Sequence, residues 1–261
     1  MRPLPPGLAI VLLAVLGGTA AANDLAPTGT LRATFIASNP VQAVTDAATG
    51  EVRGPAAELT RELARRLGVP FRITGAQGVP GVIDSVRKGE ADIGFVAFDP
   101  VRAAEVDFSQ AYSLAQNTYV VLERSPIRSV NEIDRAGLRI GVGARDAGDL
   151  FLTRNLKQAE LIRNPGGNLD VAVAKLNAGE IDAYAANRQR LSELLARVPG
   201  LRLLPDNFYG VEQSIIVAKG NAGLSAVDRF LDEARASGLI AGAIARAGLV
   251  GVDVAPAREA R

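Results

Sequence analysis

The stretch RKGEADIGF, residues 87–95, decides the fold expected for this chain, because NAGEIDAYA at 177–185 repeats its pattern. Each stretch has a Gly-Glu-x-Asp run that follows a predicted helix and opens a predicted strand, with the glycine as the helix stop. Such a short match is weak by itself, but the order of helices and strands around both copies also agrees. The repetition predicts two similar α/β lobes rather than one large sheet.

Strand and helix patterns alternate along most of the chain on both sides of these runs. Strands are predicted at 31–35, 71–74, 91–97, 138–143, 159–163, 181–186 and 212–218, and helices at 55–68, 82–89, 147–156, 168–179, 224–236 and 239–247. This alternation is typical of mainly parallel sheets with helices on both faces. The expected fold class is therefore α/β, with two similar Rossmann-like lobes.

Two chain crossings, near residues 112–117 and 209–214, are expected to join the lobes. They place 30–112 together with 214–250 in the first lobe and 117–209 in the second. Two crossings beside a cleft are typical of hinge-bending proteins that enclose a ligand.

Both ends of the chain are expected to lie outside the lobes. Residues 1–22 combine a positive charge, an apolar run from Leu8 to Leu16 and small residues ending at Ala22, which is typical of a cleaved secretory signal. A membrane anchor is the alternative, but this run is shorter than the roughly 20 residues of a spanning helix. The protein is therefore expected in a bacterial periplasm. The tail at 251–261 is predicted to be disordered.

The composition excludes several classes of function. The chain has no cysteine and no histidine, so disulfides, thiolate or histidine metal sites and Ser–His or Cys–His catalysis are not expected. Its 29 basic and 28 acidic residues nearly balance, which does not favour nucleic-acid binding. No cofactor or metal is predicted.

One arginine in FDPVRAAEVDFSQAY, residues 98–112, needs a partner. The sequence predicts a helix capped by Asp99, and a cation in its first turn, Arg102, meets the positive end of the helix dipole. An anion should therefore face Arg102. That anion is either a ligand carboxylate, held by the planar guanidinium, or the nearby Glu105.

The stretches at 54–71, 82–95 and 99–112 resemble, in order and spacing, the amino-acid-type extracellular solute-binding proteins of ABC importers. Their most specific piece is Arg102 followed by VDFSQAY. The resemblance runs from about Leu31 to Leu249. It implies a type II periplasmic binding fold, a small solute in the cleft, and closure on binding. It also implies a monomer whose partners are an ABC permease and ATPase.

The resemblance assigns roles residue by residue. Arg102 stands where the family's arginine binds the ligand carboxylate. Ala97 stands where a hydroxyl residue is usual, and Val79 where an aromatic side chain often stacks on the ligand. Arg145 and Asp146 replace small residues of a turn in the second lobe.

Two asparagines complete the candidate ligand-binding set. Asn187 stands where the family has an acidic residue for an α-ammonium group, and Asn39 follows the first predicted strand. Asn187 suits a hydroxyl or carbonyl better than an ammonium, or it is an ordinary loop residue. These departures favour a small organic anion, such as a hydroxy or keto acid, over an ordinary α-amino acid.

The remaining charged candidates have alternative roles. Arg145 is either a second cation for a dianion or a surface residue paired with Asp146 or Asp149. Asp146 is a helix cap or a ligand contact. Arg188 and Arg190 are predicted to lie on a solvated helix face.

The expected function is a binding protein that delivers a small carboxylate-bearing solute to an importer. The alternative is a dehydratase-like lyase on the same scaffold, in which carboxylates such as Asp146, or Lys or Tyr, act as acid and base. No paired-carboxylate motif supports this alternative. The sensory domain of a receptor is a third hypothesis.

Overall fold

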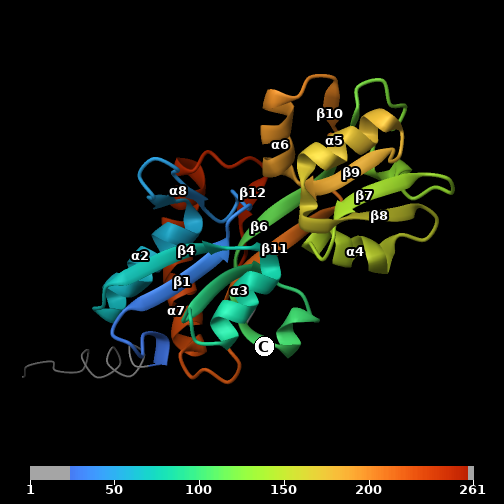
Figure 1. Cartoon of the computed structure of the whole chain (residues 1–261). Coiled ribbons are helices and arrows are strands. Elements are labelled where there is room, and N and C mark those ends of the chain that lie inside the picture. The colour runs from blue at the N-terminus through green and yellow to red at the C-terminus, as the bar shows by residue number, and fades with distance from the viewer. Residues whose placement is uncertain (1–23, 258–261) are drawn as a thin grey trace, which may run out of the picture.

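The computed structural model describes residues 24–257, so the predicted signal segment and residues 258–261 lie outside the described part of the chain. A ten-stranded sheet runs through the molecule in the order β4-β1-β5-β11-β6-β9-β7-β8, and β10 and β12 also pair with β6. Helices pack around its two halves (Figure 1). No helix within 24–257 has the length and apolar character needed to cross a membrane.

The first lobe lies at the β4 end of this sheet. Its strands are β1 (Leu31–Ile36), β4 (Phe71–Ala76) and β5 (Ile93–Ala97), and its helices are α2 (Pro55–Leu67), α3 (Gly78–Arg87), α7 (Leu224–Ala236) and α8 (Leu239–Arg246). Strand β1 lies between β4 and β5 and is parallel to both, and β11 runs antiparallel beside β5. A small hairpin, β2 (Val44–Thr45) with β3 (Val52–Arg53), precedes α2.

The second lobe repeats this arrangement at the β8 end. Its strands are β7 (Arg139–Gly143), β8 (Glu160–Asn164), β9 (Ala183–Asn187) and β10 (Leu201–Leu203), and its helices are α4 (Ala147–Asn155), α5 (Leu169–Ala178) and α6 (Arg188–Arg197). Strand β7 lies between β8 and β9 and is parallel to both, and β6 runs antiparallel beside β9. The prediction of two similar α/β lobes with mainly parallel strands is confirmed, but the expectation that they would not form one large sheet is wrong, because β11 and β6 pair and join both halves in a single ten-stranded sheet.

The repeated Gly-Glu-x-Asp run has the same structural role in both lobes. Asp92 accepts hydrogen bonds from the backbone N–H of Arg32, at 2.8 Å, and from its guanidinium. Asp182 accepts from the backbone N–H of Arg139, also at 2.8 Å. The glycine of each run has a φ of +68°, a left-handed conformation that favours glycine. Each run therefore ends a helix and holds the start of the neighbouring strand.

Two long strands, β6 (Val106–Leu122) and β11 (Tyr209–Ala218), connect the lobes and pair antiparallel with each other. Strand β11 continues into pairing with β5, whereas β6 pairs with β9 from Asn117 onward. The register of the β6–β11 pair shifts on both sides of Ser214. Both strands pass between the lobes in the middle of the molecule (Figure 1).

Helix α2 illustrates how the sequence determines a core element. Pro55 occupies its first turn, and the chain leaves the helix at Gly68, which has a left-handed φ of 70°. Leu59 and Leu63 lie one turn apart on the buried face. Both belong to the largest apolar cluster, which also contains strands β1 and β5.

The structure differs from two sequence-based expectations, one for the segment after Asp99 and one for the C-terminal tail. The helix expected after Asp99 is a three-residue 3-10 turn, Arg102–Ala104, because β6 begins at Val106. In the tail predicted to be disordered, Val252–Val254 forms β12, which pairs antiparallel with β6. Val252 also packs in the first-lobe core, and this burial offsets the entropy of ordering the segment.

Candidate functional site

A pocket of about 70 Å³ lies between the lobes. Its walls come from the ends of first-lobe strands, from the start of α4 and α6 in the second lobe, and from β6 and β11. It is small beside the roughly 300–1,000 Å³ of sites for drug-sized ligands. Its lining includes Asn39, Ala97, Arg102, Asp146, Asn187 and Arg190. The structure therefore brings together five of the six predicted site residues, and Arg145 is the exception.

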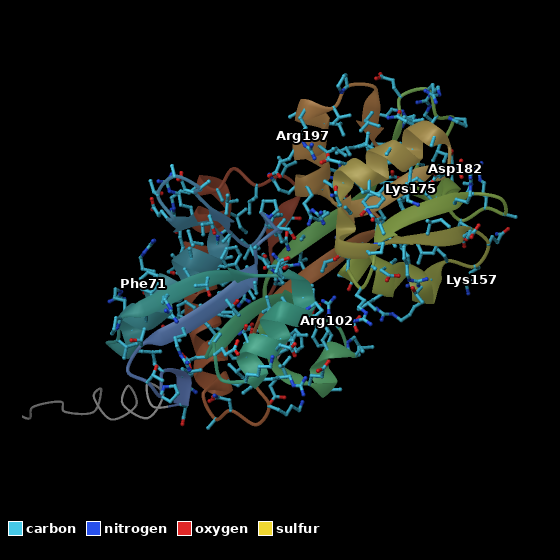
Figure 2. The ribbon with its side chains drawn as sticks, in the orientation of Figure 1. Phe71, Arg102, Lys157, Lys175, Asp182 and Arg197 are labelled. Carbon is cyan, nitrogen blue, oxygen red and sulfur yellow. The ribbon has the colours of Figure 1, made fainter. Side chains whose placement is uncertain are left out.

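Arg102 lies between the lobes (Figure 2) and is 5% exposed. Its Nη1 donates to the carbonyl of Ala97, at 2.8 Å, and its Nη2 donates to the carbonyl of Arg145, at 2.9 Å. Burial lowers the pKa of Arg102, although Asp99 and Asp146 act in the opposite direction. Two of its five N–H donors are used in this way, so three remain for other partners.

Glu105, the local anion proposed for Arg102, and the neighbouring Asp99 both have other partners. Glu105 pairs with Arg87 at 2.8 Å. Asp99 accepts from the backbone N–H of Val101 and forms an ion pair with Arg154 of α4, at 3.0 Å. Arg102 is therefore a buried cation that forms no ion pair with another described residue.

Ala97 and Val79 both line the pocket. Ala97 contributes its backbone carbonyl to Arg102, whereas its methyl group provides no hydrogen bond. Val79, in the first turn of α3, adds an apolar wall without an aromatic ring. Compared with a family member that has a hydroxyl residue and an aromatic residue at these two positions, this first-lobe wall is less polar and cannot stack an aromatic ring on the ligand.

Asp146 occupies the N-cap position of α4, but its side chain makes no capping hydrogen bond. Its Oδ2 lies 3.8 Å from Nη1 of Arg190. Desolvation in the pocket raises the pKa of Asp146, and the guanidinium groups of Arg190 and Arg102 oppose this shift. The expectation that Asp146 caps the helix is wrong, and its carboxylate lines the pocket.

Arg145 has an exposed side chain and a left-handed φ of 64°. Its backbone N–H donates to Asp149 Oδ2, at 2.8 Å, and its carbonyl accepts from Arg102. Its guanidinium forms no ion pair with Asp146, Asp149 or any other described residue. Arg145 therefore reaches the site through its backbone, because the turn directs its carbonyl toward Arg102.

Asn187 and Asn39 meet across the pocket, where Asn187 Nδ2 donates to Asn39 Oδ1 at 3.3 Å. Asn187 also caps α6, because its Oδ1 accepts from the backbone N–H of Arg190 at 2.9 Å. Both ends of the Asn187 amide are thus engaged.

Several pocket residues were not predicted. Arg190 is 16% exposed on its side chain and donates to the carbonyl of Gly167, so its assignment to a solvated helix face is wrong. Arg188 does not line the pocket; it is half-buried and donates to the carbonyls of residues 204–206. Gln42 and Gln213, both buried, bond to each other at 3.2 Å. The helical pattern of 188–197 did not show that its first turn would pack against the second-lobe strand ends.

Comparison with known proteins gives the family of this chain. The model of the bacterial extracellular solute-binding proteins, family 3, matches residues 32–246. The chain belongs to this family. The suspected resemblance is confirmed, and with it a substrate-binding role in ABC transport. A search of curated proteins found no match.

Solved structures share the fold of this family 3 protein. A mutant of ArgBP from T. maritima is 23% identical, with a TM-score of 0.69, over 87% of this chain and 98% of that one. An amino acid ABC transporter substrate-binding protein from Streptococcus pneumoniae, bound to L-arginine, is 21% identical, with a TM-score of 0.70, over 85% and 96%.

An ancestral amino acid-binding protein, described as a precursor of cyclohexadienyl dehydratase, is 19% identical, with a TM-score of 0.70, over 87% and 98%. At these identities the likeness concerns the fold. The fold of the family 3 protein described here is that of the type II periplasmic binding proteins.

Proposed function

We propose that this protein is the periplasmic solute-binding component of an ABC importer and captures a small carboxylate-bearing solute between its lobes. The observation that supports this most is the buried guanidinium of Arg102. It lines the pocket, forms no ion pair within residues 24–257, and keeps three free N–H donors. A buried cation without an ion pair is costly, and a carboxylate suits its planar donor geometry.

Two further features support capture by closure. Both lobes contribute to the pocket, and Arg102 already contacts a carbonyl from each of them. In this proposal, residues 30–112 with 214–250 and residues 117–209 move as two bodies about β6 and β11. The closed form presents itself to the permease and ATPase in the membrane, and the protein acts as a monomer.

Ligand binding tests the proposal directly. The purified protein, unfolded and refolded to remove bound solute, is titrated calorimetrically with amino acids, monocarboxylates, dicarboxylates and neutral sugars. We expect the wild-type protein to bind a carboxylate. Arg102→Lys should lose about 10- to 100-fold in affinity, because it keeps the positive charge but lacks the two parallel N–H donors of the guanidinium. Arg72→Lys, an exposed substitution on β4, is the matched control.

Sugar binding without carboxylate binding would overturn the proposal. So would a carboxylate affinity that Arg102→Lys leaves unchanged. The proposed export is tested separately. The mass of the protein recovered from the periplasm should correspond to a chain that begins at Asn23.

A lyase is the second candidate function, and one observation favours it. Asp146 carries a carboxyl group whose pKa is raised by desolvation, in the same pocket as Arg102. A carboxyl group of this kind suits proton donation to a leaving hydroxyl. Incubation with hydroxy acids, followed by NMR for products, separates the two: turnover supports the lyase, and stable binding supports the binding protein.

A further inference from the structure

The proposed function uses Arg102 to bind the carboxylate of the solute. It gives no role to another polar group of the pocket, the side-chain carboxylate of Asp146. This carboxylate forms no hydrogen bond with any residue of 24–257, although Asp146 stands at a helix N-cap. Arg190 Nη1, at 3.8 Å, lies beyond hydrogen-bond distance, and Arg190 instead donates to the carbonyl of Gly167. Its acceptor positions are therefore available to a molecule in the pocket.

The turn around Asp146 leaves room for its carboxylate. A Cβ at Gly143 would overlap Asp146 Oδ2, and a Cβ at Gly167 would lie 3.4 Å from the same atom. The two glycines thus leave room for the carboxylate. The side chain of Asp146 stays 45% exposed because it faces open space.

The charges of the lining limit what the pocket accepts. Arg102 and Arg190 are cations and Asp146 is an anion, so the described lining carries one net positive charge. A monocarboxylate neutralises it, whereas a second carboxylate would add a negative charge beside Asp146. A zwitterion would leave the positive charge uncompensated. A hydroxyl satisfies Asp146 without changing this balance.

The side-chain amide of Asn187, which could have bound an ammonium or a hydroxyl group of the solute, already has hydrogen-bond partners within the protein. Asn187 donates to Asn39 and accepts from the backbone of Arg190. Asp146 is therefore a charged acceptor in the second-lobe wall that still lacks a hydrogen-bond donor among the described residues.

We propose that Asp146 is the specificity-determining residue of this pocket: it accepts a hydrogen bond from a hydroxyl group of a hydroxy monocarboxylate whose carboxylate is bound by Arg102. The inference rests on the proposed function. It assigns the solute class, and it places the discriminating contact on α4 rather than at Asn187.

Matched three-carbon acids test this directly. The refolded wild-type protein is titrated with L- and D-lactate, pyruvate, L-alanine and malonate, and the series is repeated with the four- and five-carbon homologues. We expect a hydroxy acid to bind about 10- to 100-fold more tightly than the keto acid of the same length, the worth of one hydrogen bond to a charged group. Amino acids and dicarboxylates should bind more weakly than the hydroxy acid.

Variants separate the role of Asp146 from a general effect on the pocket. In Asp146→Ala the preference for hydroxy over keto acid should fall to less than about threefold. Gly143→Ala should do the same by displacing the carboxylate without removing its charge. Asp170→Ala, in the first turn of α5 and outside the pocket, is the matched control and should leave all affinities unchanged.

The outcomes distinguish the two proposals. If no carboxylate binds wild type, the proposed function fails and this inference fails with it. If carboxylates bind through Arg102 but the hydroxy acid has no advantage, or Asp146→Ala keeps that advantage, this inference alone fails. Tighter binding of the amino acid than of the hydroxy acid also overturns it and leaves the proposed function intact.

Discussion

The guanidinium of Arg102 donates a hydrogen bond to the backbone carbonyl of Arg145, 43 residues away along the chain and in the other lobe, at 2.9 Å. The same side chain bonds the carbonyl of Ala97 in its own lobe. Arg102 therefore has a structural role between the lobes in addition to its proposed contact with the solute.

This double role predicts that Arg102→Ala destabilises the protein without any ligand. The variant leaves two carbonyls without their donor, and we expect a loss of about 1–3 kcal/mol in the free energy of unfolding. Urea unfolding of ligand-free wild type and variant measures it. An unchanged free energy would show that water replaces the guanidinium at both carbonyls.

A second contact between the lobes is the ion pair of Arg154 with Asp99, at 3.0 Å. We predict that Arg154→Ala weakens closure, because it removes the cation beside a carboxylate that is 4% exposed. The loss is limited to about 1 kcal/mol or less, since Arg154 is 48% exposed. Small-angle scattering should show a larger radius of gyration.

Arg163→Ala is a closely matched control for this experiment. Arg163 pairs with Asp149 at 3.0 Å with nearly the same exposure, 48% and 6%, but both residues lie in the second lobe. The control should lose similar stability without a change in radius. An equal change in both variants would contradict a role of Arg154 in closure.

The repeated Gly-Glu-x-Asp runs make unequal contributions to stability. Asp92 is 5% exposed and accepts from both the backbone and the side chain of Arg32, whereas Asp182 is 30% exposed and lies 3.5 Å from Nη2 of Arg139. We expect Asp92→Asn to cost about 1–3 kcal/mol and Asp182→Asn less. Chemical unfolding compares the two, and an equal or reversed order would contradict the assignment.

The pH dependence of stability has a contribution from Glu62. Hydrogen bonds from Arg65 and Arg66 lower the pKa of Glu62 from 4.5 to about 2. Because the folded value lies below the unfolded one, this contribution is present above pH 4.5 and is lost as the pH falls toward about 2. Glu62→Gln should flatten the acid limb of the stability curve, and an unchanged slope would contradict this.

Much of the fold follows from sequence patterns because neighbours along the chain determine it. The face of α2 that carries Leu59 and Leu63 and the glycine stop at Gly68 appear where the pattern predicts them. The Gly-Glu-x-Asp repeat predicted the second lobe, and the same strand order occurs in both. The turn at Arg102–Ala104 was mistaken for a helix because a proline after a capping aspartate starts either structure.

The site was predictable only in part. Arg102 stands out in the sequence as a cation in the first turn of a predicted helix and by its place in the family's pattern, although the structure has only a 3-10 turn there. The contact of Arg102 with the carbonyl of Arg145 had no sequence signal, because any residue type can supply a backbone carbonyl. The buried position of Arg190 had none either, because the helical periodicity of α6 places its first turn on a solvent-facing side.

By itself the sequence determined the alternation of strands and helices and the two-lobe repeat, and it singled out Arg102 as a candidate for the site. These depend on short-range periodicity, on glycine geometry and on residue type. The tertiary structure alone decided which walls meet in the pocket, that the Asp146 carboxylate lacks a hydrogen bond, and that Asn187 is already engaged. The reason is physical: the pocket walls and the Asn187–Asn39 contact join residues from different lobes, which lie far apart along the chain and meet through the pairing of β6 with β11 and β9.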